Sequence, residues 1–582
     1  MAGERWHVVG HALRGVPGTG KQQSNSLPTE RHRGRSLQMV GMSGALAVGV
    51  LLAFTLPARS QEPDDPAVAA AVSERIDAIL EKRLQEAGVT PAPPADEAEF
   101  FRRAYLDLNG VVPTASEVMA FLADGGTGAL ARPAQPGEGA RPSTADTRPD
   151  KRARLVDRLL ANPRFGAHLA TVWTKVLLPA DALTDRADQV AGFTAWLRRR
   201  FAEGIRYDNI VADLLTTTGN SDRGGAALFY TASGLKPEEL AAGTSRIFLG
   251  VQIQCAQCHN HPFDRWKQED FWGYAAFFAR LQQAPGARPP VVELVDAVAG
   301  EVKLPESETV VPPKFLDGAP PEESADMNRR QQLALWIVSR DNPYFARVAV
   351  NRVWTHLFGR GLVHPADDFS EHNPPSHPEA LDALARYFVA TGYDLKSVFR
   401  VLANTRAYQR SSRAVSESDL LPPELFGRVQ MKVLTPEQLY DCLTLATRRF
   451  EIEPPPAPNT PLQMQGSTRQ QFIARFNRST QEATEFEAGI PQVLSLMNGA
   501  LTSEITDPER SGILLALEAP VFDDVERIDA LFLSTLSRPP SDEERKELSA
   551  YIAGGGPAHD RRKALGDVLW MLLNSSEFIM NH

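Results

Sequence analysis

Apolar residues recur at helical spacing along most of the 582-residue chain. Near its beginning Val72, Ile76, Leu80 and Leu84 follow one another every four residues, which places them on one face of a helix. Similar periods predict helices within 61–123 and over 151–160, 173–178, 190–201, 209–215, 237–251, 268–280, 332–338, 345–358, 376–390 and 395–402. The sequence has no sustained strand alternation and no clear internal repeat. We therefore predict a mostly α protein.

Four short motifs mark expected helix starts. In each, a hydroxyl side chain is placed to accept a backbone N–H of the first helical turn, and a Glu or Gln three residues later reaches back. The motifs are Thr114 with Glu117, Ser376 with Glu379, Thr435 with Gln438, and Ser541 with Glu544.

Composition divides the helical pattern into two parts. Short β-branched pieces lie among prolines at 291–294, 301–304 and 309–311, which predicts a linker with a small β-hairpin over 284–325. We expect an N-terminal helical domain over 61–283 and a C-terminal helical domain over 326–582. A Gly-, Pro- and Ala-rich stretch at 124–150 has no apolar period and predicts an exposed, flexible insertion.

The first 60 residues are typical of a leader. Arg31, Arg33 and Arg35 precede the uncharged apolar run Met39–Leu56, and Ala58-Arg59-Ser60 offers small residues for a cleavage site. We expect an exported protein, periplasmic, at the cell surface or extracellular, with residues 1–60 removed. A retained membrane anchor is the alternative, because the run is nearly long enough to span.

Charge narrows the choice of partners. The chain has 62 Lys and Arg against 72 Asp and Glu, a net charge of −10. Residues 1–60 hold seven basic and two acidic side chains, so the remainder carries −15. An acidic mature protein argues against nucleic acid and anionic membrane surfaces. We expect a redox partner or a cell-surface component, and contact with a membrane only through an uncleaved leader.

The segment Cys255-Ala256-Gln257-Cys258-His259 contains two of the three cysteines. C-x-x-C-H is the attachment pattern of haem c, in which both thiols bind the porphyrin and the His binds iron. A metal site is a second possibility, with His259, His261 and Asp264 as further ligands and zinc as the suitable ion. A disulfide or a packed pair of cysteines is the third. Cys442 is expected to be a buried small hydrophobe.

Seven aromatic residues follow the motif between Phe263 and Phe278. They could form an apolar wall for a haem. However, Phe271, Tyr274 and Phe278 have the spacing of any buried helix face, so core packing is the expected role of most of them.

A second polar cluster lies at 364–377, with three His and three carboxylates. It would suit a metal or an acid/base pair, and so a metal-dependent hydrolase, but its prolines favour a solvated loop. We expect Arg352, on the preceding helix, to pair with Asp367 or Asp368. No nucleophile elbow, phosphate-binding Gly loop or zinc-protease helix is present in the sequence.

Several motifs together resemble one family. They are 251–259 with His261-Pro262-Phe263-Asp264 and Trp266, then 103–110, 351–354, 358–363, 367–369, 572–578 and 581–582. In this order they resemble secreted bacterial proteins, abundant in planctomycetes, with paired domains of unknown function 1549 and 1553. The resemblance covers about residues 74–582 and implies no established activity. Relatives usually carry Asp at the position of Asn260, which weakens a metal site there.

These observations leave two functions open. The first is an exported protein that carries haem c at Cys255, Cys258 and His259 and serves electron transfer or a redox reaction. The second is a non-haem binding or scaffold protein, with a zinc- or disulfide-stabilised CxxCHxH segment, that acts on a partner or glycan. Whether the protein is an enzyme stays open.

Overall fold

The computed structural model describes residues 66–124, 150–220, 225–285, 293–316, 320–322, 324, 326–413, 421–449, 468–476 and 496–582. Helices account for 60% of these residues and strands for 4%, which confirms the mostly α prediction. The expected leader and nearly all of the expected insertion at 124–150 lie outside the described residues. None of the described helices is both long and apolar enough to cross a membrane.

Most helices of the first half lie where the apolar periods predict them, whereas those at 180–185 and 228–232 were not predicted. They are α2 (Pro66–Glu86), α3 (Glu97–Asn109), α4 (Ala115–Ala123), α5 (Lys151–Ala161), α6 (Pro163–Leu177), α7 (Ala180–Asp185), α8 (Ala187–Ala202), α9 (Tyr207–Thr216), α10 (Leu228–Ala232), α11 (Pro237–Thr244), the π-helix η1 (Ser245–Leu249), the 3₁₀ helix η2 (Gln254–Gln257) and α12 (Gln268–Ala275).

The second half is also helical. Its helices are α13 (Arg329–Ile337), α14 (Phe345–Phe358), α15 (Pro378–Ala390), α16 (Leu395–Ala403), the 3₁₀ helix η4 (Pro423–Leu425), α17 (Pro436–Ala446), α18 (Thr468–Phe476), α20 (Ala500–Ile505), α21 (Gly512–Leu517), α22 (Asp524–Thr535), α23 (Asp542–Gly554), the 3₁₀ helix η6 (Gly556–Ala558), α24 (Arg561–Leu573) and α25 (Ser576–Ile579).

The strands are short and antiparallel. β1 (Gly219–Asn220), β3 (Glu293–Asp296) and β2 (Leu281–Gln283) form one sheet in the order β1-β3-β2. β4 (Val302–Lys303) and β5 (Val310–Val311) form the predicted hairpin. β6 (Lys432–Val433) pairs with β7 (Met580–Asn581), which holds the end of the chain beside α17.

Three of the four expected capping boxes are confirmed, at Thr114, Thr435 and Ser541. The fourth prediction is wrong. Helix α15 begins at Pro378, so Ser376 lies one residue before the N-cap position and Glu379 is one residue too close to the helix start. The Ser376 hydroxyl instead donates to the carbonyl of Leu362 at 3.2 Å.

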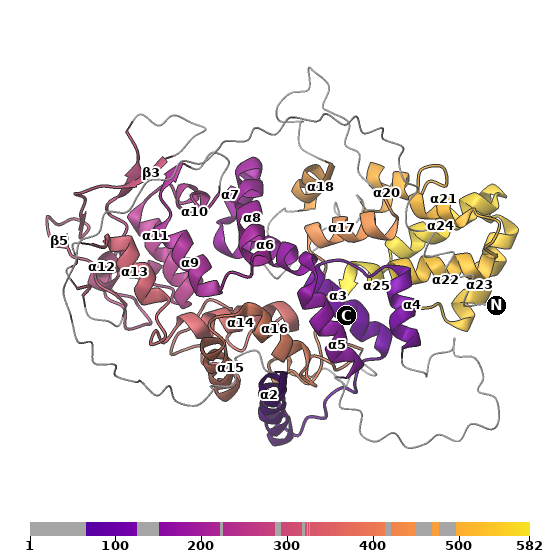
Figure 1. Cartoon of the computed structure of the whole chain (residues 1–582), viewed down its shortest axis with the longest axis horizontal. Coiled ribbons are helices and arrows are strands. Elements are labelled where there is room, and N and C mark those ends of the chain that lie inside the picture. The colour runs from indigo at the N-terminus through magenta and orange to yellow at the C-terminus, as the bar shows by residue number, and fades with distance from the viewer. Residues whose placement is uncertain are drawn as a thin grey trace, which may run out of the picture. The chain divides into compact units, whose positions relative to one another are not determined.

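Helix α3 connects both halves of the sequence. It packs on α4, α5 and α6 (Figure 1), and every residue from Glu99 to Asn109 is buried. The Arg102 guanidinium donates to the carbonyls of Thr535 (2.7 Å) and Phe578 (2.8 Å), while Arg103 donates to that of Tyr408 (2.6 Å). Buried donors need such acceptors, so α3 fixes the C-terminal helices around itself.

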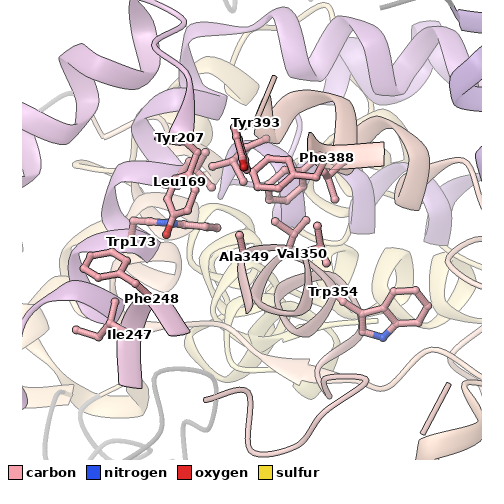
Figure 2. Close-up of a cluster of buried hydrophobic side chains, with 14 of the residues drawn as sticks. Leu169, Trp173, Tyr207, Ile247, Phe248, Ala349, Val350, Trp354, Phe388 and Tyr393 are labelled. Atoms are coloured by element: carbon pink, nitrogen blue, oxygen red, sulfur yellow. The ribbon is translucent and has the colours of Figure 1, made fainter. Parts of the chain in front are cut away.

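The hydrophobic core runs through both predicted domains. Figure 2 shows Trp173 of α6 and Tyr207 of α9 on one side and Val350 and Trp354 of α14 on the other, and these residues belong to one buried cluster. The rings of Tyr207 and Phe345 stack at 5.5 Å between centroids. Similarly, α2 lies against α15 and α16 (Figure 1). The domain boundaries at 284–325 stay a prediction.

Candidate functional site

The C-x-x-C-H segment is a single turn with an inner and an outer face. Helix η2 is a 3₁₀ helix, in which side chains three residues apart lie above one another. Ile253 and Ala256 therefore share the inner face, and both are fully buried. Cys255 and Cys258 share the outer face, and both are exposed as free thiols.

Side chains from the next helix hold this turn in place. The Gln268 amide donates to the carbonyl of Cys258 at 2.9 Å, and the Trp272 indole donates to the carbonyl of Gln257 at 3.0 Å. In return, the Asn260 side chain accepts the backbone N–H of Gln268, the first residue of α12, at 3.0 Å. Asn260 thus acts as a remote helix cap, a role that an Asp could fill equally well.

The expected metal ligands make local contacts. His259 donates from Nδ1 to the carbonyl of Asn260 at 2.7 Å, since a carbonyl can only accept. The Nδ1 atom of His261 accepts the backbone N–H of Phe263 (3.3 Å), and Asp264 accepts that of Arg265 (2.7 Å). Among the described residues no group of three or more His, Cys, Asp or Glu is placed to hold a metal ion.

The aromatic residues after the motif belong mainly to the core, as expected. Trp266, Phe271, Tyr274 and Phe278 are buried, and Phe277 joins them. Phe263 is the exception, because 76% of it is exposed.

The cluster at 364–377 packs against the segment that carries the cysteines, so the solvated-loop prediction is only partly correct. The Phe369 N–H donates to the carbonyl of Gly250 at 2.8 Å, and His372 donates to the carbonyl of Phe263 at 2.6 Å. Gly250 has φ +66°, and a Cβ there would lie 2.6 Å from the Phe369 ring. Within 364–377 only Glu371, His372 and Pro374 are exposed, and the other residues are partly or fully buried.

The ion pair expected for Arg352 is wrong. Asp367 binds Arg246 of η1 at 2.6 Å, because η1 brings that guanidinium directly over the loop. Arg352 donates instead to the carbonyl of Ile247 at 3.2 Å, and burial lowers its pKa. Burial also raises the pKa of Asp368, as do the neighbouring Asp367 and Asp264 carboxylates.

A cavity of about 620 Å³ opens between α3, α6, α14 and α17. Several of the sequence motifs contribute to the lining of this cavity, among them Asp107, Arg352, Asp367 and Asn581, whereas Cys255, Cys258 and His259 do not line it. Its wall is partly apolar, through Val172, Trp173, Val176, Leu178 and Leu183, and partly charged.

Asp107 organises the polar floor of the cavity. Its carboxylate accepts from Lys432 (2.6 Å), Asn581 (2.7 Å) and the Tyr408 hydroxyl (2.8 Å). The backbone carbonyl of Asp107 accepts from Nε2 of His356 at 2.8 Å. Burial lowers the pKa of Lys432 and raises that of Tyr408 well above its usual value, with the Asp107 charge adding to the latter.

Two histidines face each other across this floor. The rings of His168 and His356 lie 5.4 Å apart between centroids. Burial lowers the pKa of both, and nearby Lys432 adds to the effect, so both are neutral at neutral pH. Gly110 leaves room for the ring of His168, since a Cβ at position 110 would lie 2.4 Å from Nδ1 of His168.

The fold and the site thus define a mostly helical protein with an exposed C-x-x-C-H turn and a separate polar cavity. Two family models match: residues 75–283 match PSCyt2, a protein of unknown function (DUF1549), and residues 329–552 match PSD1, a protein of unknown function (DUF1553). The chain therefore contains a DUF1549 region followed by a DUF1553 region, as the resemblance implies. The name PSCyt2 suggests a cytochrome-like domain, and the activity is unknown. Comparison with curated proteins and with solved structures gives no match.

Proposed function

We propose that the protein is an exported redox protein that carries one haem c on Cys255 and Cys258, with His259 as an axial ligand of the iron. One observation carries the proposal. The 3₁₀ turn buries Ile253 and Ala256 and presents both thiols on its outer face, beside an exposed imidazole. A bound haem would supply a one-electron couple.

The thiols fit covalent attachment. Each thiol adds across a vinyl group of the porphyrin: sulfur bonds to one vinyl carbon and the thiol hydrogen moves to the other, so no oxidant is consumed. The reaction requires reduced and accessible sulfur, and Cys255 and Cys258 are both free and exposed. Cys442 is unsuited, because it is buried and burial raises the pKa of its thiol to about 12.

The imidazole of His259 fits an axial role. Its Nδ1 atom donates to the Asn260 carbonyl, which fixes the tautomer and leaves the lone pair on Nε2 for iron. Histidines that bind a metal through one ring nitrogen commonly donate the other ring N–H to a backbone carbonyl, and this hydrogen bond orients the ring. Gln268 and Trp272 donate to the carbonyls of the same turn, which restrains the backbone that carries the two thiols and the imidazole.

The surroundings fit less well with an enclosed haem. Neither the cavity beside α3 nor a smaller one beside α4 and α5 is lined by Cys255, Cys258 or His259. A haem on this outer face would be open to water, which favours the more charged oxidised iron. We therefore expect a lower reduction potential than that of an enclosed haem with the same ligands.

The leader-like N-terminal residues and the net charge of the remainder support a role outside the cytoplasm. The leader-like residues 1–60 favour export. The net charge of −15 over the remainder argues against nucleic acid as a partner. An exposed haem would exchange electrons directly with a redox partner or a cell-surface component. Periplasm, cell surface and extracellular space are the compartments in which such a protein would act.

The test is an absorption spectrum of the full chain, exported in a host with haem c maturation machinery, before and after reduction by dithionite. We expect a sharp α-band in the reduced protein that is absent from the Cys255→Ala/Cys258→Ala variant and retained in the Cys442→Ala control. A colourless mature protein would overturn the proposal. Metal analysis and thiol titration of that same sample would then separate a zinc site from a disulfide.

A further inference from the structure

The cavity beside α3 has the features of a ligand-binding site that is separate from the cysteines. Its volume of about 620 Å³ lies within the range usual for small-molecule sites. The wall combines an apolar side from α6 with charged side chains from α3, α14 and α17. We propose that this cavity binds a small organic anion that also carries hydroxyl or carbonyl groups.

The charge of the wall indicates an anion. Among the described residues, seven cationic and four acidic side chains line the cavity. Each of the four carboxylates binds one of the cations, in the pairs Lys175–Glu437, Arg246–Asp367, Lys432–Asp107 and Arg469–Asp441. Three arginines are left without a carboxylate partner within the described residues: Arg164, Arg198 and Arg352. The described part of the wall therefore has three positive charges in excess.

Arg352 is the most enclosed of the three arginines. Its side chain is enclosed enough for burial to lower its pKa, and its Nε–H is buried without an acceptor. A planar guanidinium with a free N–H matches a carboxylate, phosphate or sulfate group, which can accept two parallel hydrogen bonds. Arg164 and Arg198 are exposed, so they lie on the open side of the cavity.

Unpaired amides indicate that the ligand has further polar groups. Asn109 is only 3% exposed, and neither its oxygen nor its nitrogen has a partner in the described chain. Asn581 is 4% exposed; its nitrogen donates to Asp107, but its oxygen is unpaired. Nε2 of His168 is also buried and unpaired. Such groups are normally satisfied, so hydroxyl or carbonyl groups of a ligand would complete them.

This inference does not depend on the haem. None of Cys255, Cys258 and His259 lines the cavity, so a colourless protein could still bind an anion, and a haem protein could fail to. The binding experiment can therefore be read separately from the absorption spectrum.

Isothermal titration of the full-length protein tests the proposal, with glucuronate and glucose 6-phosphate as anionic probes and glucose as the neutral control. We expect at least one anionic probe to bind with Kd below about 1 mM, glucose to bind at least about tenfold more weakly, and the affinity to fall with added salt. Absence of heat with both anions, or equal affinity for glucose, would overturn the proposal.

Variants locate the site. Arg352→Gln should lower the affinity for the anion about tenfold or more, because it removes the enclosed guanidinium. The double variant Arg164→Gln/Arg198→Gln changes exposed residues only, so it keeps the fold even if Arg352→Gln does not, and it should weaken binding severalfold. Arg386→Gln, an exposed arginine of α15 outside the cavity, is the matched control and should bind like the wild type. Unchanged affinity in the double variant would contradict this placement of the anion.

Discussion

Gly110 gives the sharpest test of how the cavity floor is built. It ends α3 in the left-handed conformation, with φ +72°, and its N–H donates to the carbonyl of Leu106. A Cβ at this position would lie 2.4 Å from Nδ1 and 2.8 Å from Cγ of His168, which is closer than real Cβ contacts. Replacement by Ala therefore has two separate costs, one in the backbone and one against the imidazole.

The magnitude follows from these two terms. A left-handed conformation costs a non-glycine residue about 1–2 kcal/mol. Forcing an extra carbon into a packed site typically costs about 1–3 kcal/mol more. We expect Gly110→Ala to lower the free energy of unfolding by about 2–5 kcal/mol and to displace the ring of His168.

Gly88 provides the matched control. It has φ +68°, but a Cβ there would meet nothing within 4 Å, so Gly88→Ala isolates the backbone term of about 1–2 kcal/mol. Urea unfolding followed by tryptophan fluorescence measures both variants. Gly110→Ala should cost less in a His168→Ala background than in the wild type, by the contact term, since the two residues are directly coupled. If Gly110→Ala and Gly88→Ala cost the same, the account of the contact with His168 is wrong.

Three further predictions use the same unfolding assay. Glu99→Gln removes the negative charge that lies 2.6 Å from the buried Arg103 cation and should cost about 3–5 kcal/mol. Glu97 is 39% exposed, so Glu97→Gln should cost about 1 kcal/mol or less, and equal effects of the two variants would refute the role of burial. Asn260→Ala should lower the free energy of unfolding by about 1 kcal/mol, because α12 loses its cap, and Asn260→Asp should lower it by almost nothing. An equal loss in both variants would contradict the capping role of Asn260. Burial lowers the pKa of His377 to about 4, so this residue binds a proton more readily in the unfolded chain between pH 4 and 6.5. Its share of the stability should fall by about 3 kcal/mol as pH drops through that window, and His377→Phe should make the profile shallower by that amount, while His168 and His356 keep the remaining slope.

The helices could be predicted from the sequence because their signal is local. In α2, Ile76, Leu80 and Leu84 lie on one face and are buried as the four-residue spacing requires. The capping prediction at Ser376 failed for an equally local reason, since Pro378 takes the first helical position and moves the helix start by one residue.

The cavity could not be predicted, because distant residues build it. Lys432 and Asn581 meet the Asp107 carboxylate from 325 and 474 positions away in the chain. The sequence holds one signal that could have drawn attention to this region: Arg102, Arg103 and Asp107 interrupt an apolar helix, and charges in such a place are rarely buried without partners. The partners themselves are set by tertiary packing alone.

The C-x-x-C-H turn lies between these cases. Its residue types and spacing are visible in the sequence, and the 3₁₀ period explains why Cys255 and Cys258 share an exposed face. The expected ion pair of Arg352 with Asp367 or Asp368 was wrong, since the position of Arg246 on η1 depends on the π-helical turn, which no local pattern predicts.

The mass of the peptide that contains residues 255–259, released from the purified exported protein by protease, tests the central claim most directly. Covalent attachment predicts that the mass of the peptide increases by that of one intact haem, because each thiol hydrogen moves to a vinyl carbon and stays in the adduct. A peptide of unmodified mass, or one lighter by two hydrogens as a disulfide requires, would contradict the proposal that this turn carries haem.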